Sequence, residues 1–328
     1  MRWIERHWQR VTLVSALLYP LSLVFRSIVA LRRAAYRASL LPSLRLGVPV
    51  IVVGNITVGG TGKTPLVLWL ATFLSDHGFR PGIVSRGYGS TARTPRPVTA
   101  GSDPKTGGDE PVLLAHRSAR PVWVGENRAA TAEALLRAHP ECDVIVSDDG
   151  LQHYRLQRDV EFAVVDGGRG FGNGFMLPAG PLREPLSRLR TVDAVVVNGP
   201  ARPLETPRRT LTMQLNGREF RNVLNPDHTV GPAHFHRLRV HAIAGIGNPQ
   251  RFFAHLEALG LQFEAHAFPD HHRYVAADLA FPDADAILMT EKDAVKCAAF
   301  AAETHWALRV DAMPESELGE LVLRKLKI

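Results

Sequence analysis

The sequence has 328 residues, of which 45% are hydrophobic and 22% charged, and this composition excludes a disordered chain and indicates a folded globular protein. Its two cysteines, Cys142 and Cys297, have no partners at metal-ligand spacing, which excludes a disulfide framework or a cysteine-bound zinc and favours a reducing, cytosolic compartment. The formal net charge of +7 belongs to residues 1–48, which hold eight arginines and one glutamate, so a broad basic face for nucleic acid is not expected.

The N-terminal segment contains an apolar run, residues 11–31, that is just long enough to span a bilayer. Pro20 and Arg26 interrupt the run, arginines flank both of its ends, and Trp3 and Trp8 precede it as possible interfacial anchors. We therefore expect a bent helix that lies in the membrane surface and is held partly by anionic headgroups. A helix buried against the protein's own core is the alternative, and a signal peptide is not expected because no small-residue cleavage site ends the run.

From residue 49 to residue 204, short apolar runs alternate with segments of helical length. Runs that are apolar on both faces and are separated by helices, such as those expected at 65–77 and 129–139, predict an α/β domain with a doubly wound parallel sheet. The expected strands are VPVIVVG, PGIVS, PVWVG, CDVIVSDD, EFAVVD and VDAVVVNG.

The stretch IVVGNITVGGTGKTP follows the first of these runs and resembles a phosphate-binding loop. Gly62, Lys63 and Thr64 fill the last three places of G-x-x-x-x-G-K-[ST], but Thr57 stands where the first glycine is expected. A glycine-rich turn between a strand and a helix needs no ligand, yet Lys63-Thr64 at the start of a helix favours a nucleotide. The sequence therefore predicts a P-loop NTPase-like core that binds ATP through Thr57, Val58, Gly59, Gly60, Thr61, Gly62, Lys63 and Thr64.

Two acids, Asp148 and Asp149, follow the buried run VIVS, in the place of a Walker B carboxylate. Together with Thr64 they are expected to hold Mg²⁺ beside the phosphates, with Lys63 on the β- and γ-phosphates. An acidic pair at the end of a strand can also be a helix cap or a turn.

The chain becomes rich in proline and arginine at 201–207, and TLTMQLNGREFRNVL then predicts two short strands about an Asn216-Gly217 turn. A second, smaller α/β unit is expected to follow, from VHAIAGIG, a helix at 249–259, LQFEAHAF and DAILMTEKD. We thus divide the chain into a membrane-associated segment (1–48), a kinase core (49–204), and a hairpin connector with a C-terminal domain (205–328).

Two loop stretches carry candidates for the residues that activate an acceptor hydroxyl. TGGDEP contains Asp109 and Glu110, and FPDHHRY contains Asp270, His271 and His272. An acid paired with a histidine is a plausible general base, although all of these residues also suit surface turns. Candidates for contacts with phosphate are Arg86, Arg128 and Arg183, each of which could equally be a solvated surface group.

Eight motifs occur in this order across nearly the whole chain: TVGGTGKTP, SRGYG, GGDEP, GENR, SDDGLQH, LPAGPLREP, FPDHHRY and TEKDAVK. With the arginine-rich apolar N-terminus, they make the sequence closely resemble the tetraacyldisaccharide 4′-kinases. The resemblance implies transfer of the γ-phosphate of ATP to the 4′-hydroxyl of a tetraacylated glucosamine disaccharide 1-phosphate. It also implies a late step of lipid A synthesis at the cytoplasmic face of the inner membrane, with the lipid as the substrate and no obligate protein partner.

Residue by residue, the resemblance makes Asp109 the catalytic aspartate and His271, rather than His272, its partner histidine. It also places Arg183 and Glu184 in the active site. The alternative is a membrane-associated ATPase of the partitioning type, which switches by dimerisation. Val58 counts against that alternative, because it stands where those ATPases usually carry a signature lysine.

Overall fold

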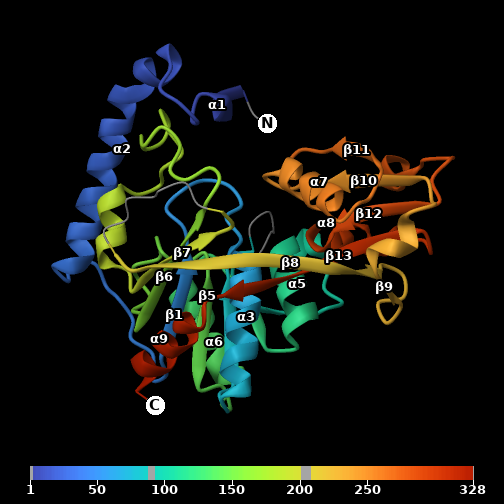
Figure 1. The fold of residues 1–328 in the computed structure, drawn as a ribbon. Helices are drawn as coiled ribbons and strands as arrows, with labels where there is room; N and C mark the ends of the chain where they lie inside the picture. Colours follow the sequence, from blue (N-terminus) through green and yellow to red (C-terminus); the bar gives the residue numbers. More distant parts are fainter. Residues whose placement is uncertain (1–2, 88–92, 201–207, 328) are drawn as a thin grey trace.

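The computed structural model describes residues 3–87, 93–200 and 208–327. The predicted domain boundary at residue 204 and the proline-rich segment around it lie outside these ranges. Figure 1 shows two lobes joined by long strands, with the helix α2 (Leu13–Arg37) standing along the side of the larger lobe that faces away from the smaller one.

The larger lobe, which we call the core lobe, is built on the parallel sheet expected from the apolar runs. Its strands lie in the order β7-β6-β1-β5-β2-β4, and β3 (Arg96–Val98) adds to the edge in the antiparallel sense. The parallel strands are mostly apolar and almost entirely buried, because both faces of the sheet are covered. Their bounds are β1 (Val50–Gly54), β2 (Pro81–Ser85), β4 (Val122–Val124), β5 (Val144–Asp148), β6 (Val160–Asp166) and β7 (Ala194–Asn198).

Helices pack on both faces of this sheet. One face packs against α3 (Lys63–Asp76), α5 (Asp109–Ser118) and α9 (Ser316–Leu326), and the other against α6 (Arg128–Ala138), the short helix η1 (Leu186–Thr191) and part of α2. The short helices α1 (Trp3–Arg6) and α4 (Pro104–Gly107) complete the lobe. Its loops at the carboxyl ends of the strands are thereby held on a rigid three-layer frame.

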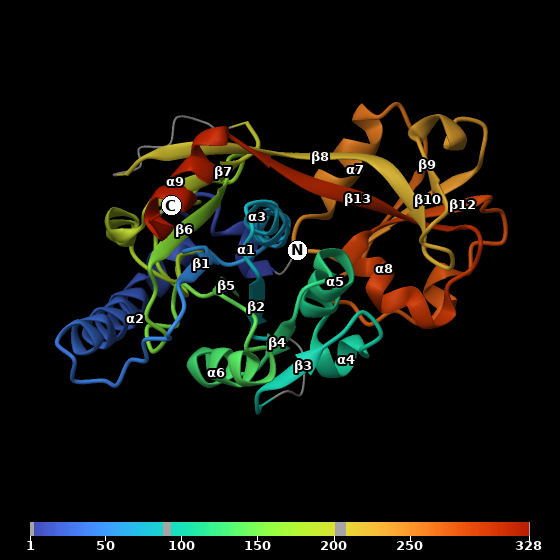
Figure 2. The ribbon, with the colours of Figure 1, turned by 90° about the horizontal axis from the view of Figure 1, so that it is seen from below.

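The smaller lobe, which we call the C-terminal lobe, continues the same sheet through β8 (Thr210–Asn222) and β13 (His305–Pro314). Figure 2 shows these two strands crossing from one lobe to the other. Beyond them, β12, β10 and β11 pair in parallel, and β9 (Thr229–Val230) pairs with β8. The other bounds are β10 (Val240–Ala244), α7 (Pro249–Ala258), β11 (Glu264–Ala267), η3 (Ala276–Leu279), β12 (Ala286–Thr290) and α8 (Glu291–Cys297), with η2 (Pro232–Phe235) and η4 (Ala298–Phe300).

The predicted hairpin about Asn216-Gly217 is wrong. β8 is a single strand of 13 residues, and β13 pairs with both of its halves in the antiparallel sense. Asn216 pairs with Asp311 and Glu219 with Arg309, so the register shifts between them and Gly217 lies in a bulge, where a Cβ would lie 2.9 Å from the carbonyl oxygen of Arg309. Because a strand from much later in the chain pairs with the whole of β8, the local turn signal is overridden.

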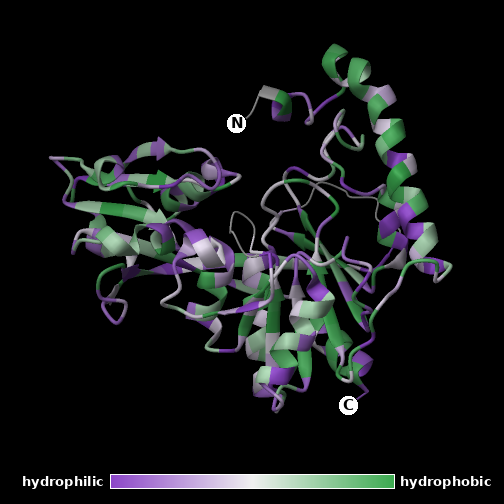
Figure 3. Ribbon diagram, turned by 180° about the vertical axis from the view of Figure 1, so that it is seen from behind, coloured by the Kyte–Doolittle hydropathy of each residue, from purple (hydrophilic) through white to green (hydrophobic). Residues whose placement is uncertain are grey.

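The helix α2 presents one side to the core lobe and leaves most of its apolar surface uncovered. Its Ser22 donates to the carbonyl of Met176 at 2.8 Å, and Phe25 and Val29 pack against the core. Figure 3 shows hydrophobic residues along this helix, which runs to Arg37 and includes Pro20. It is long and apolar enough to cross a membrane, and 11% of its most hydropathic window is buried. α2 is therefore not a buried core helix, which was the alternative prediction.

Candidate active site

The loop between β1 and α3 has the conformation that a phosphate-binding loop requires. Gly59 and Gly62 have φ angles of 99° and 94°, in the left-handed region that favours glycine. A Cβ at Gly62 would also collide with the side-chain amide of Asn198, which donates to the loop backbone at 2.9 Å. Thr57, at the place of the missing glycine, pairs with Leu182 in an isolated β-bridge. The loop thus requires the conformational freedom of glycine at Gly59 and Gly62, and not at Thr57.

The loop leads directly into a helix whose N-terminus faces the two predicted acids. α3 begins at Lys63, and the Nζ of Lys63 lies 3.5 Å from Oδ1 of Asp149. β5 lies beside β1, with Asp148 opposite Val53 in the register, because the two strands pair in parallel. The structure therefore brings the P-loop lysine and the acidic pair together at one edge of the sheet, where a helix dipole favours phosphate.

The two acids have opposite electrostatic environments. Burial and then the negative charge of Glu110 raise the pKa of Asp148 to about 7. Burial would also raise the pKa of Asp149, but the charges of Lys63 and Arg183 outweigh it and hold that pKa well below its usual range. Asp149 is therefore ionised at neutral pH, whereas the nearby charges of Lys63 and Arg128 do not offset the burial of Asp148.

The donor set at this edge fits Mg²⁺. Oδ1 of Asp148 is buried and has no hydrogen-bond partner among the described residues, although Oδ2 accepts from Ser85 at 3.1 Å. An orphaned buried carboxylate oxygen, a second carboxylate on Asp149 and the hydroxyl of Thr64 at the start of α3 are hard oxygen donors of the kind that Mg²⁺ prefers. A divalent cation would also remove the destabilisation of ionised Asp148.

Asp109 and His271, which are 162 residues apart, form a hydrogen-bonded pair between the lobes. Nδ1 of His271 lies 3.0 Å from Oδ2 of Asp109, and the Asp109 side chain is buried. Asp109 lies at the N-terminus of α5, and His271 lies in the loop after β11 with a φ of 59°. Burial raises the pKa of Asp109, but the hydrogen bond from His271 and the charge of Lys292 outweigh it and lower the pKa to about 2.

Lys292 lies between the acids of the TGGDEP and FPDHHRY stretches. This lysine was not predicted from the sequence. Its Nζ lies 3.1 Å from Glu110, 3.7 Å from Asp109 and 3.8 Å from Asp270, and 3.5 Å from Nε2 of His271. Burial lowers the pKa of Lys292, but the three carboxylates outweigh it and raise the pKa above its usual range. The lysine is thus a buried cation shared by the dyad and its neighbours. It is the second residue of α8 and lies in the motif TEKDAVK, to which no catalytic role was assigned from the sequence.

The other histidine of FPDHHRY lies elsewhere. Nε2 of His272 lies 3.0 Å from Oδ2 of Asp278, and its ring stacks on Phe268 at 4.7 Å. His272 is therefore engaged within the C-terminal lobe, and His271 is the histidine that meets Asp109.

Two of the predicted arginines lie at the acidic pair. Arg183 donates to both carboxylate oxygens of Asp149, at 2.8 and 3.1 Å, and also to Asn55. Arg128 is buried and donates to the backbone carbonyls of Gly125 and Asp148, and burial lowers its pKa to about 10. Neither is a solvated surface group. Arg86, at the end of β2, is exposed, and its charge also acts on Arg128.

Glu184 takes part in a different network from that of Arg183. It is buried, and its carboxylate accepts from Tyr154 at 2.6 Å and from Gln152 at 3.1 Å. Arg188 and Arg33 of α2 lie 3.4 and 3.9 Å away. Glu184 therefore ties the N-terminal helix to the core lobe beside the site.

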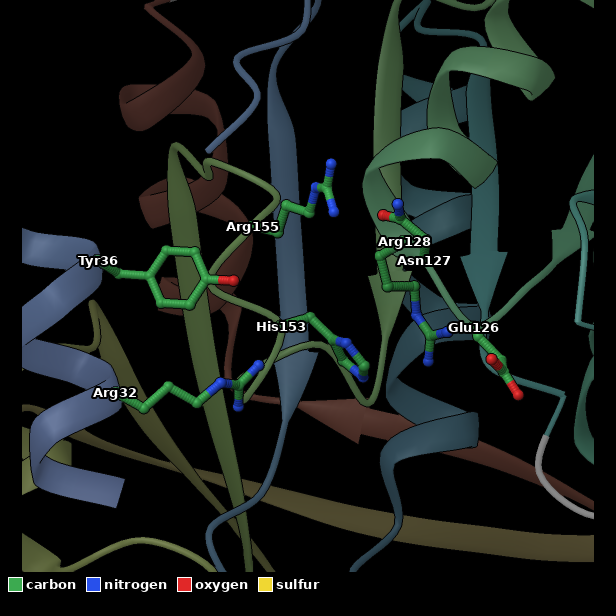
Figure 4. Close-up of a pocket in the computed structure, with 7 residues that line it drawn as sticks. All are labelled: Arg32, Tyr36, Glu126, Asn127, Arg128, His153 and Arg155. Atoms are coloured by element: carbon green, nitrogen blue, oxygen red, sulfur yellow. The ribbon is translucent and has the colours of Figure 1, made fainter. Parts of the chain in front are cut away.

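A basic hollow opens between α2 and the acidic pair. It has a volume of about 250 Å³. Figure 4 shows Arg32 and Tyr36 of α2 on one side, Arg128 on the other and His153 between them. Burial lowers the pKa of His153 to about 3, so this ring is neutral at neutral pH. The complete lining is Arg32, Tyr36, Glu126, Asn127, Arg128, His153 and Arg155. The hollow lies at the C-terminal end of α2, and it can receive a polar, anionic group there.

His153 and Arg155 were not predicted as site residues, although His153 is the last residue of the motif SDDGLQH. Arg251 of α7 was missed as well; it donates to Asn198 at 2.7 Å, so the C-terminal lobe reaches the residue that holds the P-loop backbone. All these contacts join segments far apart in the chain, and no local pattern signals them.

The chain is similar to known proteins over nearly its whole length. Residues 14–327 match the family profile described as Tetraacyldisaccharide-1-P 4'-kinase. The tetraacyldisaccharide 4'-kinase of Methylobacillus flagellatus is 52% identical over 327 residues, which cover 99% of this chain and 96% of the relative. That of Azoarcus sp. (strain BH72) is 53% identical over 98% of this chain and 94% of the relative. A crystal structure of LpxK from Aquifex aeolicus in complex with ATP superposes with a TM-score of 0.83 at 30% identity, covering 96% of this chain and all of that one.

Proposed function

The chain belongs to the tetraacyldisaccharide-1-P 4′-kinase family and is a kinase of lipid A biosynthesis, and we propose that the P-loop edge of the core lobe and the Asp109–His271 pair together form its active site. The acceptor is the 4′-hydroxyl of a tetraacylated disaccharide 1-phosphate, and the donor is ATP. The observation that supports this proposal is the 3.0 Å contact between Asp109 and His271, because it joins an ionised acid and an imidazole from opposite lobes.

In this proposal the nucleotide phosphates lie on residues 57–64, with Lys63 balancing negative charge on the transferred group. Thr64, Asp148 and Asp149 would hold Mg²⁺, which supplies positive charge to the phosphates when it is bound. Arg183, held by Asp149 at 2.8 Å, lies where a guanidinium can contact phosphate oxygens.

The acceptor hydroxyl loses its proton to the Asp109–His271 pair as its oxygen bonds to the γ-phosphorus, while the bond from that phosphorus to the β,γ-bridging oxygen breaks and ADP leaves. Asp109 suits this role because it is ionised at neutral pH, with its pKa at about 2. The resulting proton is shared between a carboxylate and an imidazole, and Lys292 keeps both groups in place.

We propose the basic hollow lined by Arg32, Arg128 and Arg155 as the subsite for anionic groups of the lipid headgroup.

A transfer assay tests the function. We expect the purified full-length protein, with γ-labelled ATP, Mg²⁺ and the tetraacylated disaccharide 1-phosphate, to give labelled lipid. The matched control is the same lipid already phosphorylated at its 4′-position, which should stay unlabelled. Release of free labelled phosphate without labelled lipid would instead identify an ATPase of the partitioning type.

We further propose that α2 lies in the surface of the inner membrane, on its cytoplasmic face, and brings the site to the lipid. The support is a stripe of exposed apolar side chains that repeats every three or four residues along the helix. Six of them are at least 57% exposed, namely Leu13, Leu17, Leu21, Val24, Ile28 and Leu31. The arginine-rich end of α2 adjoins the basic hollow, as would suit a substrate with buried acyl chains and an accessible headgroup.

Replacing Leu17 and Ile28 by glutamate should weaken binding to anionic vesicles by about tenfold or more, because each apolar side chain contributes roughly 1–2 kcal/mol when it leaves water. Cosedimentation with phosphatidylglycerol vesicles measures this. The matched control replaces Leu224 and Met313, which are 56% and 59% exposed outside α2, and changes the charge equally. Equal binding by both double variants would show that the stripe does not contact the membrane.

A further inference from the structure

A cluster of two histidines and two carboxylates lies in the C-terminal lobe, on residues that take no part in the proposed kinase site. His241 lies on β10, and Glu264 and His266 lie on β11. The parallel register places His241 opposite Glu264 and Ile243 opposite His266, so the three polar side chains share one face of the sheet. Among them His241 is buried, His266 is half-buried and Glu264 is exposed. The cluster is therefore preformed on two paired strands and open to solvent on one side.

The ligand atoms are close enough to share one cation. Nδ1 of His241 lies 2.9 Å from Nε2 of His266, and Oε1 of Glu264 lies 3.7 Å from the same Nε2. One donor atom from each of the three residues falls within 4.8 Å of the others. Phe281 stacks on both imidazoles, with ring centroids 4.4 Å apart, and shields them from solvent.

A carboxylate on the far side of His241 completes the arrangement. Oδ1 of Asp283 lies 3.5 Å from Nε2 of His241. A carboxylate beside Nε2 favours the proton on that nitrogen, which leaves the lone pair on Nδ1, facing His266. This is the kind of outer partner that metal-bound histidines commonly have. Asp283 thus favours the tautomer of His241 that a metal ion would need.

We propose that His241, His266 and Glu264 bind a borderline divalent cation such as Zn²⁺. The cation forms bonds to Nδ1 of His241 and Nε2 of His266. The proton that the two nitrogens share moves through solvent to Nδ1 of His266, so both imidazoles bind as neutral ligands. Two imidazoles on a tetrahedral Zn²⁺ have their nitrogens about 3.3 Å apart, so the pair opens by a few tenths of an ångström. Glu264 supplies an oxygen, and water fills the remaining position.

Imidazole ligands separate this site from the proposed Mg²⁺ site, whose donors are all oxygens. The cysteines do not compete, because both are buried and burial raises the thiol pKa, to about 11 for Cys142 and about 12 for Cys297. The proposal therefore depends on none of the residues assigned to phosphoryl transfer, and either proposal can fail without the other.

Titration of the untagged full-length protein with Zn²⁺ in excess Mg²⁺ tests the proposal. We expect one site with a dissociation constant in the micromolar range or tighter. His266→Ala should weaken binding by about tenfold or more, and Asp283→Asn, which removes only the outer partner, should weaken it by about tenfold.

Two controls keep the result interpretable. Glu264→Gln changes an exposed side chain and should also weaken Zn²⁺ binding while leaving the unfolding temperature of the metal-free protein unchanged. His236→Ala removes an exposed histidine outside the cluster and should leave the affinity unaltered. The proposal is overturned if the wild type binds no Zn²⁺ below about 100 µM, or if His266→Ala and His236→Ala bind it equally well.

Discussion

Replacing Asp109 by alanine should lower the turnover of lipid phosphorylation by about 10²- to 10⁴-fold while leaving ATP affinity nearly unchanged. The factor is that of losing a positioned general base, and Asp109 is the ionised partner of His271 at 3.0 Å. Steady-state rates with saturating lipid measure the loss, and binding of a fluorescent ATP analogue measures the nucleotide site separately. A fall in turnover alone is the signature of an interaction made in the transition state.

The matched control for this variant is Asp103→Asn. Asp103 is an exposed acid six residues earlier, at the N-cap of α4, and asparagine can still cap the helix. It should retain wild-type turnover. Asp109 is not the base if Asp109→Ala stays within about threefold of the wild-type rate.

Replacing Lys292 by methionine should lower turnover by about 100-fold and move the acidic limb of the pH–rate profile to higher pH. Methionine removes the cation among Asp109, Glu110 and Asp270 and leaves these carboxylates to repel one another. Lys292 helps to depress the pKa of Asp109, so that pKa rises in the variant. Because the ionised form is the active one, activity is lost as the pH falls through the pKa of Asp109, and that loss now comes at higher pH.

The pH dependence distinguishes a positioning role from a merely structural one. Lys292→Arg keeps the charge and should restore most of the rate and the original acidic limb. Lys325→Met removes another ion pair, with Asp193 at 2.7 Å on the core lobe, and should alter neither. A uniform loss of rate at every pH in Lys292→Met would mean that the lysine supports the fold but does not tune the dyad.

The core strands and the P-loop could be predicted because a short, continuous stretch of sequence determines each of them. Apolar β-branched runs define β1, β5, β6 and β7, and the residues around Lys63 show a helix start after glycines. The parallel arrangement then brings the ends of β1 and β5 together, which places Asp148 and Asp149 beside the loop.

What could not be predicted depends on contacts between distant segments. The approach of His271 to Asp109 requires the C-terminal lobe to lie over α5, where Arg117 of α5 also pairs with Glu291 of α8 at 2.7 Å. Lys292 acquires its surroundings in the same way. The hairpin prediction failed for this reason too, since the partner of β8 comes from far along the chain. Local patterns carry backbone preferences, whereas these features depend on how the lobes pack.

The pairing of β8 with β13 also determines when the core sheet can be completed during translation. The C-terminal lobe is encoded between these two strands, so the ribosome makes it before the core sheet receives its last antiparallel strand. α9, whose Leu318 and Val322 join the core packed against α3, emerges later still. The P-loop helix, made some 250 residues earlier, therefore keeps an apolar surface exposed on the nascent chain until translation passes α9. During that interval the unfinished sheet exposes apolar surface and an unpaired strand edge, the features that make a nascent chain prone to aggregate.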